Sequence, residues 1–359
     1  MTDFCKNRYV LCILTMILWS LSLSGCGKNT DIAFITDMGT VQDGSFNQGA
    51  YEGVTRYLEG KDKTCRIYEP DGASTAEYLK NIKAAVHDGA DVIVCPGVLF
   101  EEAIYSAQKK YPRVHFILVD GVPHDASGRD RTIKKNTMPI MFAEEQAGFL
   151  AGYSAVRDGN TELGFVGGTN QESVIQFGYG FVQGADYAAI ETGRNVNIKY
   201  CYANTFLESD EVKSMCSAWY RGGTQVIFAC GGAMGRSVFA AAEENGGKVI
   251  GVDVDQSKDS ETIITSAEKM LGNAVYYGLS DSYSDQFKGG SVYEMNATNG
   301  GIGLEMENSR FESFTEDQYK AILDQLISGR IVPYSAADHG NTSDLELVNT
   351  QVYYLELNK

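Results

Sequence analysis

The chain has 359 residues, enough for two domains with cores of their own, and its hydrophobic content of 43% is ordinary for a soluble globular protein. Its formal net charge is −17. A surface this acidic repels nucleic acid, because binding to phosphates requires clustered lysine and arginine side chains.

Residues 1–25 have the pattern of a secretory signal peptide. Lys6 and Arg8 precede an apolar run at residues 9–23, which is followed by the small residues of a cleavage site. The run is too short for a comfortable membrane span. We therefore exclude residues 1–25 from the folded protein.

The end of this segment reads Leu-Ser-Gly-Cys, with the cysteine at position 26. The tetrapeptide resembles a bacterial lipobox, which implies cleavage before Cys26 and acylation of its thiol. An ordinary signal peptide with an incidental cysteine is the alternative. Lipidation would make residues 26–30 a tether on the outer face of a membrane and leave the rest of the chain soluble.

A strand, a polar loop and a helix are predicted for residues 32–58. The apolar run at 32–35 is typical of a buried strand, the aspartates and glycines after it of a turn, and the apolar spacing after Gln48 of a helix. In an open α/β sheet, ligands bind beyond the carboxyl ends of the strands, where this loop lies. We interpret it as a binding loop.

The loop offers carboxylate, hydroxyl, amide and aromatic side chains, among them Asp37, Ser45, Phe46 and Asn47. Asp43 or Ser45 has an alternative role as the cap of the helix. Phe46 has no obvious core to enter at a helix start, although a hydrophobic staple is an alternative. The ring is therefore the strongest indication of ligand binding in this loop.

Strands and helices then alternate in two similar runs. Elements of the first run are predicted at residues 66–68, 75–87, 91–95, 100–109 and 114–120. A loop at 121–130 and a helix of small residues at 144–156, suited to close helix packing, separate the runs. Elements of the second run are predicted at residues 163–168, 173–190, 198–203, 209–221, 225–230, 236–244 and 249–253. Short connections between alternating elements predict parallel sheets with right-handed crossovers.

Each run closes on a strand with an aspartate at its carboxyl end, Asp120 in the first and Asp253 in the second. Acidic strand ends on facing edges predict a cleft between two lobes, where small-molecule sites commonly lie. Residues 262–359 contain a strand at 262–266, helices at 271–286 and 315–327, and a glycine-rich edge. This is too little for a third domain, so we expect it to cross back and complete both lobes.

Several groups of the second half could contact a ligand. The glycine-rich turn at 231–235 could offer backbone N–H groups, but it lacks the spacing of a dinucleotide site. Asp253 and Asp255 could chelate Ca²⁺, although no EF-hand pattern surrounds them. Lys269 could pair with Asp253 and bind ligand hydroxyls, or it could be a solvated lysine at a helix start. Phe206 could stand opposite the first ring, or it could belong to a core.

The chain shows no activated nucleophile and no metal-ligand spacing among its four histidines. Its cysteines after Cys26 lie mostly in apolar runs and are interpreted as buried thiols, with a bridge between Cys201 and Cys216 as a weaker alternative. These cysteines are Cys65, Cys95, Cys201, Cys216 and Cys230.

Taken together, the motifs resemble the basic membrane protein family of lipoproteins, the PnrA-like, purine-nucleoside-binding subunits of ABC transporters. The motifs that carry the resemblance are the lipobox, Asp-Gly-Ser-Phe-Asn-Gln at 43–48, the strand at 116–120, Gly-Phe-Val-Gly-Gly at 164–168, Gly-Phe-Val-Gln-Gly at 180–184, Gly-Val-Asp-Val-Asp-Gln-Ser at 251–257, Thr265-Ser266 and Lys269. They occur in that order along nearly the whole mature chain.

The resemblance implies an α/β, type I periplasmic-binding-protein fold, with two doubly wound parallel-sheet lobes and a three-crossing hinge. The lobes would comprise residues 31–145 with about 267–300, and residues 146–266 with about 301–359. It also implies a monomeric, lipid-anchored protein on the extracytoplasmic face of the cell membrane, with permease subunits as partners. Neither a cofactor, nor a metal, nor catalysis is expected.

The resemblance further implies that the purine lies between the rings of Phe46 and Phe206. The side chains implied to hydrogen-bond the base are Asp37, Asn47 and Asp120. The groups implied to bind the ribose are Asp253, Lys269 and the backbone of Gly232. Ser45, in the same loop as Phe46, completes the predicted ligand-binding set.

Other functions stay open on the residues alone. The first is binding of another hydroxylated ligand, such as a sugar or a riboflavin-like molecule. The second is a nucleoside hydrolase, against which the missing metal-type aspartate cluster argues. A surface adhesin is the third.

Overall fold

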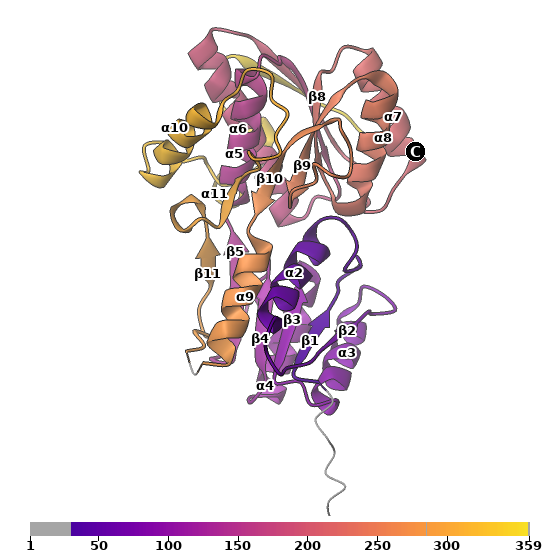
Figure 1. The fold of residues 1–359 in the computed structure, drawn as a ribbon, viewed down its shortest axis with the longest axis vertical. Helices are drawn as coiled ribbons and strands as arrows, with labels where there is room; N and C mark the ends of the chain where they lie inside the picture. Colours follow the sequence, from indigo (N-terminus) through magenta and orange to yellow (C-terminus); the bar gives the residue numbers. More distant parts are fainter. Residues whose placement is uncertain (1–29, 285, 358–359) are drawn as a thin grey trace, which may run out of the picture.

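The computed structural model describes residues 30–284 and 286–357, so the predicted signal peptide and Cys26 lie outside the described residues. The described chain forms two α/β lobes, stacked one above the other in Figure 1. The predicted fold class is confirmed by two largely parallel sheets with helices on both faces. Within the described ranges, no helix is both long enough and apolar enough to cross a membrane.

The first lobe is built on a parallel sheet with the order β11-β5-β4-β3-β1-β2. Its strands are β1 (Ile32–Ile35), β2 (Cys65–Tyr68), β3 (Val92–Pro96), β4 (His115–Val119), β5 (Thr137–Phe142) and β11 (Tyr293–Met295). Its helices are α2 (Phe46–Leu58), α3 (Thr75–His87), α4 (Glu101–Lys110) and α9 (Leu271–Ser282). Alternate residues of each strand enter opposite cores, so Ile32 and Phe34 pack toward α2 and α9 while Ala33 and Ile35 pack toward α3 and α4.

The second lobe has the strand order β12-β10-β9-β8-β6-β7-β13, in which β12 alone among the described strands runs antiparallel to its neighbour. Its strands are β6 (Glu162–Gly167), β7 (Val196–Tyr202), β8 (Val226–Cys230), β9 (Lys248–Asp253), β10 (Ile263–Lys269), β12 (Ile302–Leu304) and β13 (Thr350–Tyr354). Its helices are α5 (Glu144–Arg157), α6 (Glu172–Thr192), α7 (Asp210–Arg221), α8 (Gly235–Asn245), α10 (Glu316–Ile327) and the short α11 (Ala336–His339). Single 3-10 turns are η2 (Val98–Phe100), η3 (Gly232–Met234), η4 (Ala297–Asn299) and η5 (Thr342–Asp344).

The chain passes between the lobes three times, from β5 to α5, from β10 to α9 and from β11 to β12. After the second crossing, α9 lies beside α2 in the lower lobe of Figure 1. After the third crossing the chain is back in the upper lobe, where α10 lies. The predicted strand at 262–266 extends to Lys269 as β10. One edge of β10 pairs with β9, and residues 267–269 pair with β12 along the other edge. Lys269 therefore ends a strand of the second lobe, just before the crossing.

Small residues bring α5 and α6 into backbone contact, as their pattern predicts. A Cβ at Gly152 would lie 2.0 Å from the carbonyl oxygen of Phe181, and one at Gly184 would lie 2.0 Å from the carbonyl oxygen of Phe149. No side chain fits at such distances. These glycines let the helix that starts the second lobe lie directly against the longest helix of that lobe.

The cysteines of the described chain are free thiols, and Cys201 and Cys216 do not form a bridge. Cys65 is half-buried, whereas the other four are buried. Burial raises the pKa of the Cys65 thiol to about 12 and that of Cys216 to about 12. The thiols are thus protonated and unreactive at neutral pH.

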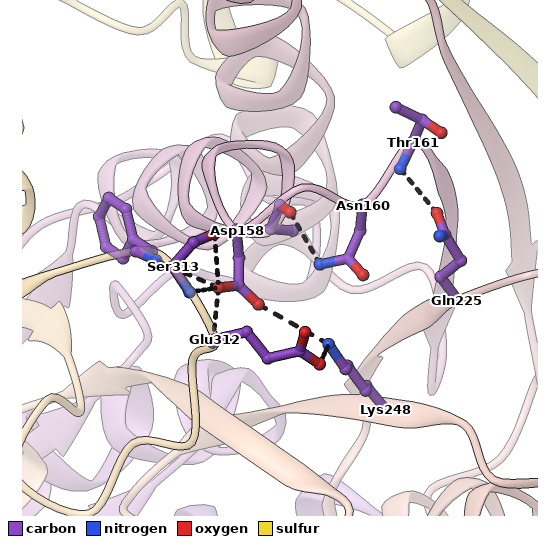
Figure 2. A network of polar contacts seen from close by, with 9 residues as sticks. Asp158, Asn160, Thr161, Gln225, Lys248, Glu312 and Ser313 are labelled. Carbon is purple, nitrogen blue, oxygen red and sulfur yellow. Dashed lines mark hydrogen bonds and ion pairs between the residues drawn. The ribbon is translucent and has the colours of Figure 1, made fainter.

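A buried carboxylate just after α5 binds the backbone of residues 312–314, which precede α10 (Figure 2). Asp158 Oδ1 accepts hydrogen bonds from the backbone N–H groups of Glu312, Ser313 and Phe314 at 2.7, 2.7 and 3.1 Å. Asp158 Oδ2 lies 3.8 Å from Nζ of Lys248, which also pairs with the exposed carboxylate of Glu312 at 2.6 Å. The side chain of Asp158 is fully buried.

We expect Asp158→Ala to lower the free energy of unfolding by about 3 kcal/mol, because it leaves three backbone donors without an acceptor. Glu312→Ala is the matched control, since it removes a largely exposed ion pair of the same network and should cost far less stability. Chemical denaturation measures both. Equal losses for the two variants would contradict an anchoring role for Asp158.

Candidate functional site

A cavity of about 400 Å³ lies between the lobes, at the carboxyl ends of the parallel strands. Every predicted ligand-binding residue except Ser45 lines it. These lining residues follow or end strands of both sheets: Asp37 after β1, Asp120 after β4, Phe206 after β7, Gly232 after β8, and Asp253 and Lys269 at the ends of β9 and β10, with Phe46 and Asn47 at the start of α2. The topology thus brings distant parts of the chain to one site.

Three non-glycine residues of the described chain have a positive φ, and all three line the cavity. They are Asp120 (φ 55°), Asn204 (φ 56°) and Asp253 (φ 70°). The left-handed conformation is uncommon outside glycine, although Asp and Asn tolerate it best. Concentrated strain of this kind is typical of ligand sites, where it fixes the direction of a side chain.

Lys269 is the centre of the charged part of the site. Its Nζ donates a hydrogen bond to Asp120 Oδ2 and lies 3.5 Å from both Asp253 Oδ1 and Glu144 Oε1. Lys269 is only 4% exposed, so the alternative of a solvated lysine is wrong. The predicted pairing with Asp253 is present, but the closer partner is Asp120 from the first lobe.

Burial and charge oppose each other in this cluster. Burial disfavours the charge on Lys269, but Asp120, Asp253 and Glu144 outweigh it and raise the pKa of the lysine. Burial raises the pKa of Asp120 despite the nearby lysine, and it holds the pKa of Glu144 well above its usual range. The acids thus favour the charged form of Lys269, whereas burial disfavours the charged forms of Asp120 and Glu144.

The two predicted rings come from opposite lobes. Phe46 is the first residue of α2 and Phe206 lies between β7 and α7; both are half-buried and line the same cavity. The ammonium of Lys269 lies 4.7 Å from the ring centroid of Phe46. Phe206 packs over Gly168, where a Cβ would lie 2.5 Å from the ring. Neither ring is fully buried in the core of a lobe.

The loop after β1 is held by its own side chains. Asp37 Oδ1 accepts hydrogen bonds from the Gly39 backbone N–H at 2.8 Å and from Asn47 Nδ2 at 2.9 Å, and Asn47 also donates to Asp43 Oδ2 at 2.9 Å. Asp43 Oδ1 accepts from the Gln48 backbone N–H at 3.1 Å, so the capping role belongs to Asp43. Asn47 is 2% exposed and spends its amide hydrogens on two carboxylates. Its amide therefore holds the Asp37 carboxylate in place, while the residue also lines the cavity.

Ser45 is predicted among the ligand-binding residues, but its side chain does not line the cavity. It is fully buried, makes no capping bond, and its Oγ donates to Asp253 Oδ2 at 2.5 Å across the lobes. Gln256 Nε2 likewise donates to the Gly44 carbonyl at 2.9 Å. These bonds hold the first loop against the second lobe. Ser45 orients Asp253 in this structure and makes no direct contact with the cavity.

Gly232 lines the cavity with bare backbone. It opens η3 with φ 56°, a conformation that strongly favours glycine. The predicted metal alternative finds no support, since Asp255 accepts hydrogen bonds from the Ser257 backbone and from Asn308, away from Asp253. In the part of the chain that the structure describes, no cluster of three or more acidic, histidine or cysteine side chains is placed to hold a metal ion.

The structure adds lining residues that the sequence does not single out. Most of them follow a strand end or lie at a helix start, as Val98, Thr169, Ser173, Asn204 and Arg236 do, whereas Phe177 lies in the second turn of α6. The buried Oγ1 of Thr169 and Oδ1 of Asp120 have no hydrogen-bond partner among the described residues. Both atoms are available to a bound molecule with N–H or O–H groups. Glu144 carried no signal beyond that of an ordinary acidic first turn.

Known proteins resemble this chain along most of its length. The model of the family described as ABC transporter substrate-binding protein PnrA-like matches residues 30–336. The ABC transporter nucleoside-binding protein BmpA of Lactococcus lactis is 29% identical over 363 residues, covering 90% of this chain and 98% of that protein. Basic membrane protein B of Borrelia garinii is 28% identical over 340 residues, covering 91% and 96%.

Among solved structures, a solute-binding protein of an ABC transporter system from Aeropyrum pernix K1 superimposes with a TM-score of 0.74. It is 22% identical and the match covers 86% of this chain and 95% of that one. At this identity the likeness shows the fold alone. It agrees with the two lobes and the intervening cleft described above.

Proposed function

The chain belongs to the PnrA-like family of ABC transporter substrate-binding proteins, and we propose that it captures a purine nucleoside such as guanosine, inosine or adenosine in the cleft between its lobes. The observation that carries this proposal is the presence of Phe46 and Phe206, from opposite lobes, in one cavity with the Asp253–Lys269 pair. A flat heterocycle and a sugar with vicinal hydroxyls use both features at once. The relative from Lactococcus lactis, named a nucleoside-binding protein, supports the same ligand class.

In this proposal the purine lies between the two rings, and carboxylates bind its polar edge. Asp37 and Asp120 accept hydrogen bonds from the base, with Asn47 holding Asp37 in place. Asp253 and Lys269 bind the ribose hydroxyls together with a backbone N–H near Gly232, and Ser45 orients Asp253. A cavity with this many carboxylates favours a neutral ligand that donates hydrogen bonds and disfavours one that carries phosphates.

We further propose that acylated Cys26 anchors a monomer at the outer face of the cell membrane, with residues 26–30 as a tether. Hinge closure around the nucleoside then presents both lobes to the permease subunits. Binding, rather than catalysis, is the proposed role, since the described lining of the cavity offers no activated nucleophile. The alternative of a sugar or another hydroxylated ligand uses the Asp253–Lys269 pair but leaves the rings without a partner.

Calorimetric titration tests the ligand class. We expect guanosine and inosine to bind, ribose to bind far more weakly, and Phe46→Ala to weaken inosine binding roughly ten- to hundred-fold, because stacking of a base on an aromatic ring contributes about 1–3 kcal/mol. Tyr277→Ala, at a tyrosine that is 57% exposed on α9, is the control and should leave affinity unchanged. Ribose binding as tight as inosine binding would refute the purine site, and release of free base from bound inosine would show a hydrolase.

A further inference from the structure

Glu144 is a buried acid that the proposed ligand contacts do not use. It is the first residue of α5 and is 2% exposed, and its Oε1 lies 3.5 Å from Lys269 Nζ without a hydrogen-bond partner among the described residues. Together with Asp120 and Asp253 it makes three carboxyl groups around one ammonium. All of these side chains are at least nine-tenths buried.

A second cavity of about 280 Å³ adjoins the cleft at this point. Asp120 lines both cavities, whereas Glu144 lines only the second. The further acids along its wall are Glu145, Glu172 and Glu294, and its described lining contains neither lysine nor arginine. Glu144 is therefore open to a polar, acidic space from which it can exchange a proton, but which supplies no counter-charge.

Hydrogen bonding distinguishes the three carboxyl groups. Asp253 accepts from Ser45, and Asp120 accepts from Lys269. Glu144 accepts neither of these hydrogen bonds. Burial is the largest cause that raises its pKa well above the usual value, and the charge of Asp120 raises it further. The charge of Lys269 lowers this pKa but does not outweigh them. Its position in the first turn of a helix favours the charged form, but this effect is small compared with the loss of hydration.

We propose that Glu144 is a positioning residue that carries a proton when the cleft binds its ligand, so that Asp120 and Asp253 alone share Lys269. The proposal rests on the nucleoside-binding function argued above. A protonated Glu144 leaves the ammonium directed at the two carboxylates that line the cleft. An ionised Glu144 competes for the ammonium from the far side and adds an unbalanced charge to a buried cluster.

Apart from Lys269, which favours the ionised form of Glu144, the charged groups that face Glu144 in the described chain are acids. The titratable groups around it are Asp120 after β4, Asp253 of β9, Lys269 of β10, Cys230 of β8, Glu145 of α5, Glu172 of α6 and Glu294 of β11. The acids among them oppose ionisation of Glu144. Ligand binding is therefore expected to weaken as pH rises.

Titration of inosine by calorimetry between about pH 5 and pH 8, where the base of inosine stays largely neutral, tests this. The wild type should lose affinity on the alkaline side. Glu144→Ala should bind about tenfold more weakly at neutral pH, and Glu144→Gln, which mimics the protonated acid, should recover most of that loss and show no alkaline decline. Glu307→Gln, at an exposed glutamate that lines neither cavity, is the control and should follow the wild-type profile. An alkaline decline in Glu144→Gln equal to that of the wild type would overturn the proposal.

Unfolding of the ligand-free protein separates this inference from the ligand assignment. An acid whose pKa is raised by folding stabilises the folded protein less and less as pH increases. The loss begins near the ordinary pKa of the acid, 4.5 for glutamate, and continues through its pKa in the folded protein. The midpoint of thermal unfolding of the wild type should therefore fall relative to that of Glu144→Gln over this range. If the unfolding midpoints of the two proteins run parallel with pH, Glu144 is not protonated, even if inosine binds. If the midpoints diverge but inosine does not bind, only the proposed ligand class is wrong.

Discussion

Lys269→Met is expected to abolish detectable nucleoside binding and to lower the free energy of unfolding by about 3–5 kcal/mol at neutral pH. The lysine supplies the positive charge for three buried carboxyl groups, two of which line the cleft. Methionine is uncharged and one atom shorter than lysine, so Asp120 and Asp253 lose their counter-charge and Glu144 loses the ammonium 3.5 Å away. The cost is that of an uncompensated buried charge, which exceeds that of a lost surface ion pair.

The loss of stability in this variant should depend on pH. Lys269 lowers the pKa values of Asp120 and Glu144, which burial raises, so its removal raises both further. A carboxyl group with a raised folded pKa contributes less stability as pH increases through that value. The deficit relative to the wild type is therefore expected to be small in mild acid and to grow toward neutral pH.

Urea denaturation at several pH values, with Lys258→Met at an exposed lysine as the control, measures this deficit. The control should stay within about 0.5 kcal/mol of the wild type. A constant deficit across the pH range would show that lost packing, and not charge, is responsible. Retained inosine binding in Lys269→Met would remove the lysine from the proposed ribose contacts.

Gly184→Ala is expected to lower the free energy of unfolding by about 3 kcal/mol or more, because the added methyl group meets a rigid backbone. Its Cβ would lie 2.0 Å from the Phe149 carbonyl oxygen, so α5 and α6 must separate. Since α5 also carries Glu144 at its first residue, the shift should reach the charged cluster. The helix pair cannot relax by a simple rotamer change.

Gly72→Ala is the matched control, since a Cβ there meets nothing within 4 Å and the glycine has no positive φ. It should change stability by no more than about 0.5 kcal/mol. Equilibrium denaturation of both variants gives the comparison. A Gly184→Ala protein as stable as the control would show that the two helices are not locked at this distance.

Most of the fold follows from local patterns. The helix predicted at 75–87 has the observed bounds, and the strands predicted around Asp120 and Asp253 end at or next to those residues. Such elements are recognisable because burial alternates or recurs along a short stretch of chain. The edge strands β11, β12 and β13 were not predicted, because three to five residues at a sheet edge carry little periodic signal.

The site was predicted less completely, because side-chain partners lie far apart in the sequence. Strand-end position was enough to bring Asp37, Asp120 and Asp253 to one cavity, and the helix start that follows β1 brings Phe46 there. It could not indicate that Ser45 faces Asp253 instead of the cavity, nor that Glu144 joins Lys269. Ser45 looked like a helix cap, and Glu144 looked like an ordinary first-turn acid.

The sequence by itself determined two α/β lobes with acidic strand ends facing a cleft, since alternation of elements and the direction of parallel strands are local properties. Only the tertiary structure decided which charges meet. The Lys269–Asp120 bond joins residues 149 positions apart and the Ser45–Asp253 bond joins residues 208 positions apart. Whether a lysine is solvated or buried among carboxylates depends on such contacts, because they form only when the crossings bring both lobes together.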